Sequence, residues 1–267
     1  MSNPPNLPIV FVANSAYAKQ VCVMMTSILK NNPHSKIDFY ILSSCFADEC
    51  KEMVEKLRSG FDNWTVNYIC VDGSLFKDLK LSMAHVSVET YYKYMIADLL
   101  PHLSKALYLD ADMICRGSLM PLFETDLGDY YCAGVKDRSC DKRHKHRVGH
   151  AKDELYVNAG VLLLNLDKLR AERMSRTLIE NTKKYADTIL YVDQDGMNIT
   201  FKNKIKELPT KYNFTSSNMR HDYFCINRLS AVILHYTTER KPWTKLKCRM
   251  RGEWKKYEKM FEELCSH

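Results

Sequence analysis

Several motifs are missing from this 267-residue sequence, and each absence removes a class of function. There is no G-x-G-x-x-G and no G-x-x-x-x-G-K-[ST], so neither a dinucleotide fingerprint nor a P-loop is predicted. None of the ten cysteines forms a C-x-x-C, which argues against a zinc site or a thioredoxin-type redox motif. No apolar run approaches 18 residues, and the first residues lack the basic and apolar regions of a signal peptide. We therefore expect a soluble, reduced, cytoplasmic protein.

Apolar stretches of strand length recur along the chain and alternate with stretches of helical spacing. The predicted strands cover residues 9–13, 37–42, 66–71, 106–109, 130–135, 161–166 and 231–235, and the predicted helices cover 20–30, 47–58, 89–100 and 167–185. This alternation indicates a single α/β domain whose mostly parallel, Rossmann-like sheet is flanked by helices. No repeat, low-complexity tract or Pro/Gly-rich linker divides the chain, so we expect one domain at 1–245 and a basic, aromatic helical tail at 246–267.

The net charge of +7 is concentrated in two regions. Residues 136–152 contain seven Lys/Arg and two acids, and residues 236–267 contain nine Lys/Arg and five acids. A solvated surface is the commoner explanation of such runs, and phosphate, anionic lipid or nucleic acid are the alternatives. The tail carries Trp254, Tyr257 and Phe261 and is interpreted as a short amphipathic helix, with contact to a membrane surface as the alternative.

Two carboxylates, Asp110 and Asp112, directly follow a predicted buried strand. Alternate side chains of a strand share a face, so both can point to one position beyond the strand end, where open α/β sheets bind ligands. Two such oxygen ligands suit Mg²⁺ or Mn²⁺, which can hold a diphosphate. The other interpretation is a solvated strand end, because a chain with 18 aspartates contains about one D-x-D by chance.

Other residues strengthen or weaken this hypothesis. His235 ends a later predicted strand and is a candidate third ligand, and Lys241 follows as a candidate phosphate partner. The second D-x-D, Asp193-Gln194-Asp195, opens a helical stretch, where acids near the N-terminus need no function.

Six segments in a fixed order resemble glycosyltransferase family 8, the retaining enzymes of GT-A fold that include glycogenin and bacterial lipopolysaccharide galactosyl- and glucosyltransferases. The resemblance covers about residues 7–243 and is greatest to the α-galactosyltransferases of lipo-oligosaccharide synthesis. Its markers are Ile9–Ala13 with Tyr17, His85–Tyr91, Leu107–Asp112, Asn158–Leu163, Asp193–Asp195, and His235 followed by Lys241-Pro242-Trp243.

The resemblance implies a divalent cation, Mn²⁺ or alternatively Mg²⁺, that is held by Asp110, Asp112 and His235, with Ala111 beside the donor. It implies that Lys241 contacts the diphosphate of a UDP-sugar donor.

The resemblance also assigns residues to the two ends of the donor. The uridine-binding loop corresponds to Val12, Ala13, Asn14 and Tyr17. The surroundings of the transferred sugar correspond to Asn158, Ala159, Asp193 and Gln194, of which Asp193 and Gln194 are the implied catalytic residues. Positions near the sugar and the acceptor correspond to Asp137 and His85.

Three residues depart from the family pattern. Asn14 stands where the galactosyltransferases have a uracil-contacting acid, and Lys93 stands where they have an arginine. A lysine keeps the charge but loses the bidentate fork, and as a helix residue Lys93 would otherwise be interpreted as a surface lysine. Thr238 replaces a glycine of the loop that closes over the diphosphate. These departures leave the donor open between UDP-galactose and UDP-glucose.

The sequence therefore predicts a UDP-sugar-dependent, retaining hexosyltransferase that acts on a glycan or glycolipid acceptor in cell-surface polysaccharide or lipopolysaccharide synthesis. It is expected in the cytoplasm or at the inner face of the membrane, where the basic tail is a candidate peripheral contact. The rival enzymes are a glycogenin-like self-glycosylating protein and a sugar-nucleotide nucleotidyltransferase. A nucleic-acid-binding module is suggested by charge alone and is not expected.

Overall fold

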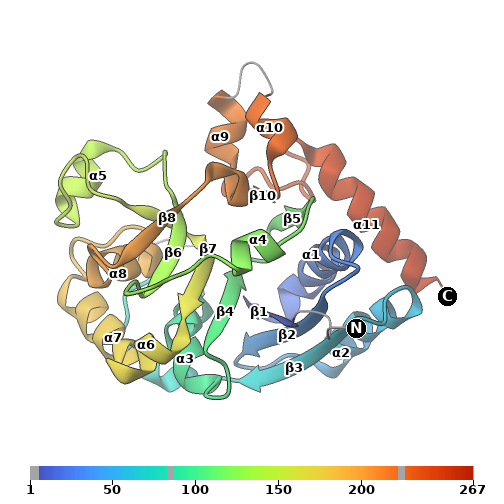
Figure 1. Cartoon of the computed structure of the whole chain (residues 1–267), viewed down its shortest axis with the longest axis horizontal. Coiled ribbons are helices and arrows are strands. Elements are labelled where there is room, and N and C mark those ends of the chain that lie inside the picture. The colour runs from blue at the N-terminus through green and yellow to red at the C-terminus, as the bar shows by residue number, and fades with distance from the viewer. Residues whose placement is uncertain (1–5, 83–86, 222–225, 267) are drawn as a thin grey trace.

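Two sheets organise the computed structural model, which describes residues 6–82, 87–221 and 226–266 (Figure 1). The strands of the large sheet lie in the order β3 (Trp64–Cys70), β2 (Lys36–Ser43), β1 (Asn6–Val12), β4 (Lys105–Leu109), β7 (Val157–Asn165), β6 (Cys132–Lys136) and β8 (Ile205–Leu208). Neighbouring strands are parallel except around β7, which is antiparallel to both β4 and β6. The predicted mostly parallel α/β sheet is confirmed.

A small second sheet consists of β5 (Met113–Cys115), β10 (Ile233–His235) and β9 (Phe214–Thr215). The strand predicted at 231–235 is shorter than expected and belongs to this sheet. Strand β10 runs antiparallel to β5, with His235 opposite Met113. This register brings a histidine from late in the chain next to the carboxylates that precede β5.

Helices cover both faces of the large sheet. One face packs against α1 (Ala18–Asn31), α2 (Asp48–Glu55) and α11 (Arg251–Cys265). The other packs against a 3-10 helix (Val88–Met95) that continues into α3 (Ile96–Leu99), and against α6 (Leu166–Ala171), α7 (Met174–Lys184) and α8 (Val192–Thr200). The shorter helices are α4 (Met120–Phe123), α5 (Lys142–Arg147), α9 (Ser216–His221) and α10 (Ile226–Ser230).

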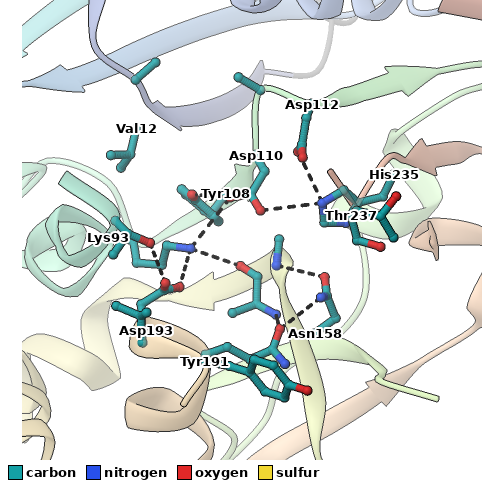
Figure 2. Close-up of a pocket in the computed structure, with 18 of the residues that line it drawn as sticks. Val12, Lys93, Tyr108, Asp110, Asp112, Asn158, Tyr191, Asp193, His235 and Thr237 are labelled. Atoms are coloured by element: carbon teal, nitrogen blue, oxygen red, sulfur yellow. Dashed lines mark hydrogen bonds and ion pairs between the residues drawn. The ribbon is translucent and has the colours of Figure 1, made fainter. Parts of the chain in front are cut away.

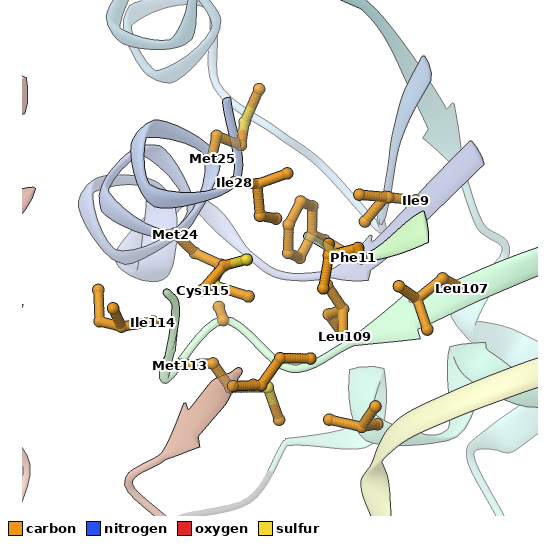
Figure 3. Close-up of a cluster of buried hydrophobic side chains, with 14 of the residues drawn as sticks. Ile9, Phe11, Met24, Met25, Ile28, Leu107, Leu109, Met113, Ile114 and Cys115 are labelled. Atoms are coloured by element: carbon orange, nitrogen blue, oxygen red, sulfur yellow. The ribbon is translucent and has the colours of Figure 1, made fainter. Parts of the chain in front are cut away.

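Strand β1 shows why the central strands are apolar throughout. Ile9 and Phe11 point to the α1 side and Val10 points to the opposite side, and all three are fully buried. In Figure 3, Met24 and Ile28 of α1 pack over Ile9 and Phe11. A sheet that is covered on both faces requires apolar residues at successive positions, as the sequence has.

Three predicted helical or loop segments differ in detail from the structure. The helix expected at 167–185 is divided into α6 and α7 because Arg173 adopts a left-handed conformation, with φ of 53°. The helix expected at 89–100 is mostly 3-10. The basic stretch expected to be a loop contains α5, which begins where the Asp141 side chain accepts the His144 N–H at 2.8 Å.

The tail forms the predicted helix, α11, and packs against α1. Its aromatic residues Trp254, Tyr257 and Phe261 are buried in the core, so they are not the part of α11 that faces outward. The division into a catalytic domain and a tail stays a prediction. None of the described helices is long and apolar enough to span a membrane, and each cysteine in the described ranges is free.

Candidate active site

A cavity of about 500 Å³ opens at the carboxyl ends of β1 and β4 and extends to the start of α8. Every described residue that we predicted for the donor site lies in its wall. These residues are Val12, Ala13, Asn14, Tyr17, Lys93, Asp110, Ala111, Asp112, Asp137, Asn158, Ala159, Asp193, Gln194, His235, Thr238 and Lys241. His85 lies outside the described residues. The structure thus places the predicted residues together, while their individual roles stay predictions.

Asp110, Asp112 and His235 converge on one position, with ligand atoms that all lie within 4.8 Å of one another. His235 Nε2 is 3.2 Å from Asp112 Oδ1 and 3.7 Å from Asp110 Oδ2, as Figure 2 shows. His235 Nδ1 lies 2.9 Å from Asn213 Oδ1, to which it can donate a hydrogen bond. That bond leaves the Nε2 lone pair free to bind a metal. A metal-ligating histidine usually has such a hydrogen-bond partner on its other ring nitrogen.

The chemistry of this cluster fits a hard divalent cation. The buried Asp112 Oδ1 has no hydrogen-bond donor within the described structure, and a buried acceptor without a partner is costly unless a cation or water binds it. Burial by itself would raise the pKa of Asp112, but the neighbouring Lys241 ammonium group holds it well below its usual range. Lys241 Nζ lies 2.5 Å from Asp112 Oδ2 and 2.6 Å from the Tyr236 carbonyl. A cation and Lys241 can therefore share one carboxylate.

Lys93 is buried beneath the cavity and is not the surface lysine expected for a helix residue. Its Nζ lies 2.6 Å from Asp193 Oδ2 and 3.7 Å from Asp110 Oδ1, and it packs over the Tyr108 ring. Burial alone would lower the pKa of Lys93, but the charges of Asp193 and Asp110 raise it above its usual value. One charged lysine thus bridges carboxylates from two different motifs.

The amide of Gln194 is fixed by bonds at both ends. Its Oε1 accepts from Asn158 Nδ2 at 2.9 Å and from the Ala159 N–H at 3.2 Å. Its Nε2 donates to Asp137 Oδ2 at 3.0 Å. The side chain is therefore held in one orientation in the cavity wall.

The second D-x-D does more than begin a helix. Asp195 is fully buried, and its carboxylate accepts the N–H groups of Leu190 and Tyr191, both at 2.8 Å. It also bonds His144 and the Tyr156 hydroxyl. Just before it, Val192 has φ of 43°, which is unfavourable for a β-branched residue and turns the chain into α8 beside the cavity. Asp195 thus holds this turn, and Asp193 and Gln194 face the cavity.

Comparison with known sequences identifies the family. The sequence model of "Glycosyl transferase family 8" matches residues 8–247. The chain belongs to glycosyltransferase family 8. A putative glycosyltransferase of Haemophilus influenzae is 31% identical over 247 residues, which are 90% of this chain and 73% of that protein. The lipopolysaccharide 1,3-galactosyltransferase of Salmonella typhimurium is 30% identical over 231 residues, which are 83% of this chain and 68% of that protein.

Solved structures of similar proteins agree with this family 8 assignment. The galactosyltransferase LgtC, in complex with donor and acceptor sugar analogues, superposes with a TM-score of 0.83 at 30% identity, over 97% of this chain and 95% of that one. Glycosyltransferase GlyE of Streptococcus pneumoniae superposes with a TM-score of 0.75 at 28% identity, over 98% of this chain and 62% of that one. The expected GT-A fold is confirmed.

Eleven residues that line this family 8 cavity were not assigned a role from the sequence, among them Glu89, Tyr108, Tyr191 and Arg220. Tyr108 had a signal, because it lies two positions before Asp110 and shares its strand face. Its hydroxyl donates to Asp110 Oδ1 at 2.5 Å, and burial raises its pKa so that it stays protonated. Glu89 lies within a family marker, but its carboxylate accepts a hydrogen bond from Asn14, and no spacing in the sequence predicts that contact.

Proposed function

We propose that this family 8 chain is a retaining hexosyltransferase that transfers galactose or glucose from a UDP-sugar to a glycan acceptor, with Mn²⁺ as its cofactor. The observation that carries the proposal is the convergence of Asp110, Asp112 and His235 beside Lys241 in one cavity. A bound Mn²⁺ would supply Lewis-acid stabilisation of the leaving diphosphate. Lys241 adds a second, fixed positive charge at the same place.

Retention of configuration requires either two displacements or attack on the same face from which the diphosphate leaves. Double displacement needs a nucleophile, which in retaining glycosidases is a carboxylate. Gln194 is a poor candidate, because its amide oxygen already accepts two hydrogen bonds. The proposal is therefore front-face attack, in which the leaving phosphate oxygen takes the proton of the acceptor hydroxyl. Gln194 and Asp193 then orient the sugar and stabilise its developing positive charge.

The similarity to the lipopolysaccharide 1,3-galactosyltransferase of Salmonella typhimurium supports an acceptor that is an intermediate of cell-surface polysaccharide or lipopolysaccharide synthesis. The proposed place of action is the cytoplasm or the inner face of the membrane.

The test is release of UDP from a panel of sugar nucleotides in the presence of Mn²⁺, with Asp110→Ala as the inactive variant. We expect one UDP-hexose to be hydrolysed slowly without an acceptor. In Asp110→Ala this rate should be about 10²–10³-fold lower. Asp62→Ala is the matched control, since Asp62 is exposed and lies outside the cavity. Loss of the Mn²⁺ paramagnetic signal on binding gives a second readout. Unchanged turnover in Asp110→Ala would refute the proposal.

Self-glycosylation is the second candidate, because Tyr191 lines the cavity and is 38% exposed. A tyrosine in that position is within reach of a donor bound in the same cavity. Intact mass after incubation with UDP-glucose and Mn²⁺ separates the two functions. A mass increase in whole hexose units that disappears in Tyr191→Phe would favour self-glycosylation.

A further inference from the structure

Helix α5 is anchored beside the active site by two buried residues of the basic stretch. His144 Nε2 lies 2.7 Å from Asp195 Oδ1, and Asp195 belongs to the same helix as Gln194. Lys145 Nζ donates to the Glu154 carbonyl at 2.5 Å and to the Lys152 carbonyl at 3.1 Å. These bonds occupy His144 Nε2 and the Lys145 ammonium group inside the protein. The helix is therefore fixed against the cavity wall.

The other cations of the stretch are exposed. They are Lys136, Arg138, Lys142, Arg143, Arg147 and Lys152, which we call the cationic rim. None of the six forms an ion pair with an acid in the described ranges, whereas Lys19, Lys51, Lys168 and Lys204 elsewhere each do.

The two acids of the stretch offset only part of the positive charge of the cationic rim, because they are outnumbered by its Lys and Arg residues. Asp137 accepts from the Ser139 N–H at 2.8 Å and from Gln194 Nε2 at 3.0 Å. Asp141 accepts the His144 N–H at the start of α5. Both carboxylates are thus engaged with neighbouring donors, and the outward charge of the cationic rim is positive.

The cationic rim is continuous with the cavity. Asp137 and Ser139, which alternate with rim residues along the chain, both line the cavity. Across the same cavity, the exposed Arg220 of α9 adds a cation that makes no ion pair within the described residues. The charge of a donor diphosphate already has partners in Lys241 and the proposed metal position. The cationic rim is therefore available to a different anion that approaches the same opening.

We propose that the cationic rim binds the acceptor, and that the acceptor is a glycan carrying a phosphate or carboxylate group. This inference rests on the proposed transferase function, because it assigns the second substrate of that site. Exposed cations on a fixed helix attract an anionic group and hold it beside the cavity, so that a neighbouring hydroxyl enters.

The probe is an array of glycans in matched pairs that differ by one phosphate ester or one carboxylate. We expect the full chain to bind the anionic member of some pairs, and added salt to weaken that binding. The variant Lys142→Gln/Arg143→Gln/Arg147→Gln should weaken it about tenfold, the summed effect of three exposed charge contacts. The control Lys255→Gln/Lys256→Gln/Lys259→Gln removes the same charge from α11, on the far side of the molecule in Figure 1, and should bind as wild type.

Equal binding to both members of every pair, or no binding to anionic glycans, would overturn the inference. Equal binding to bare phosphatidylglycerol vesicles, lost in the same α5 variant, would also overturn it, because the partner would then be a lipid surface. Release of UDP without acceptor, measured in parallel, should be unchanged in the α5 variant. If the wild-type chain released no UDP, the proposed function would be refuted instead. Failure of the inference and failure of the proposed function are therefore distinguishable.

Discussion

Gly160 lies so close to His235 that no side chain fits between them. A Cβ at Gly160 would overlap His235 Cε1 and would lie 2.7 Å from Asp110 Oδ2. The glycine of β7 therefore leaves the space in which two of the three candidate metal ligands meet.

Gly160→Ala should push His235 and Asp110 apart and weaken Mn²⁺ binding at least tenfold, because ligand geometry within a few tenths of an ångström sets affinity. Titration of the Mn²⁺ paramagnetic signal measures the change. Gly252→Ala is the matched control, since nothing lies within 4 Å of a Cβ at that position. Unaltered Mn²⁺ affinity in Gly160→Ala would show that the ligands do not meet there.

Lys93→Met should reduce the free energy of unfolding by about 3 kcal/mol, because it removes one partner of a buried charge pair and leaves Asp193 without its cation. Urea denaturation measures the difference. Lys93→Arg keeps the charge and should recover most of the loss, since the family resemblance implies an arginine at this position. If Lys93→Met and Lys93→Arg lower the free energy of unfolding equally, then the volume of the side chain and not its charge explains the effect.

Glu89 orients Asn14, the residue that the family resemblance places against the uracil. Asn14 Nδ2 donates to Glu89 Oε2 at 2.7 Å, and Asn14 Oδ1 accepts the Ala16 N–H at 3.1 Å. Asn14→Asp would place two carboxylates in contact, and we expect it to raise the KM for the UDP-sugar about tenfold, since one charge-assisted hydrogen bond is replaced by repulsion.

The double variant Asn14→Asp/Glu89→Gln restores a donor and an acceptor and should recover a KM near wild type. Steady-state kinetics on both variants and on Glu89→Gln alone tests this pairing. A double variant no better than Asn14→Asp would mean that the two residues act independently.

Gln194→Ala should lower the transfer rate about 10²–10³-fold, because it removes one preorganised polar group. The stereochemistry of the product should be unchanged. The anomeric configuration by NMR and the intact mass of the protein are the two measurements. Inverted product would contradict the front-face proposal. A covalent sugar adduct on Gln194 of the wild-type chain would also contradict it.

The sequence by itself determined the fold class and the pairing of the two carboxylates of the candidate metal site. Continuous apolar strands such as residues 9–13 report a sheet that is buried on both faces, and the two carboxylates after residue 109 share a direction because a strand alternates its side chains. These are local properties of the chain, so they can be predicted from neighbours in sequence.

Tertiary structure decided which distant residues complete the site. His235 meets Asp110 only because β10 pairs with β5 in one register, and Asn14 meets Glu89 only because the Val88–Met95 helix packs beside β1. Lys93 alone would be interpreted as a surface lysine, and His144 belongs to a basic stretch that was expected to be a loop, yet both are buried. Burial and pairing depend on non-local packing, in which a shift of one residue changes the face of every side chain, and no local pattern contains that information.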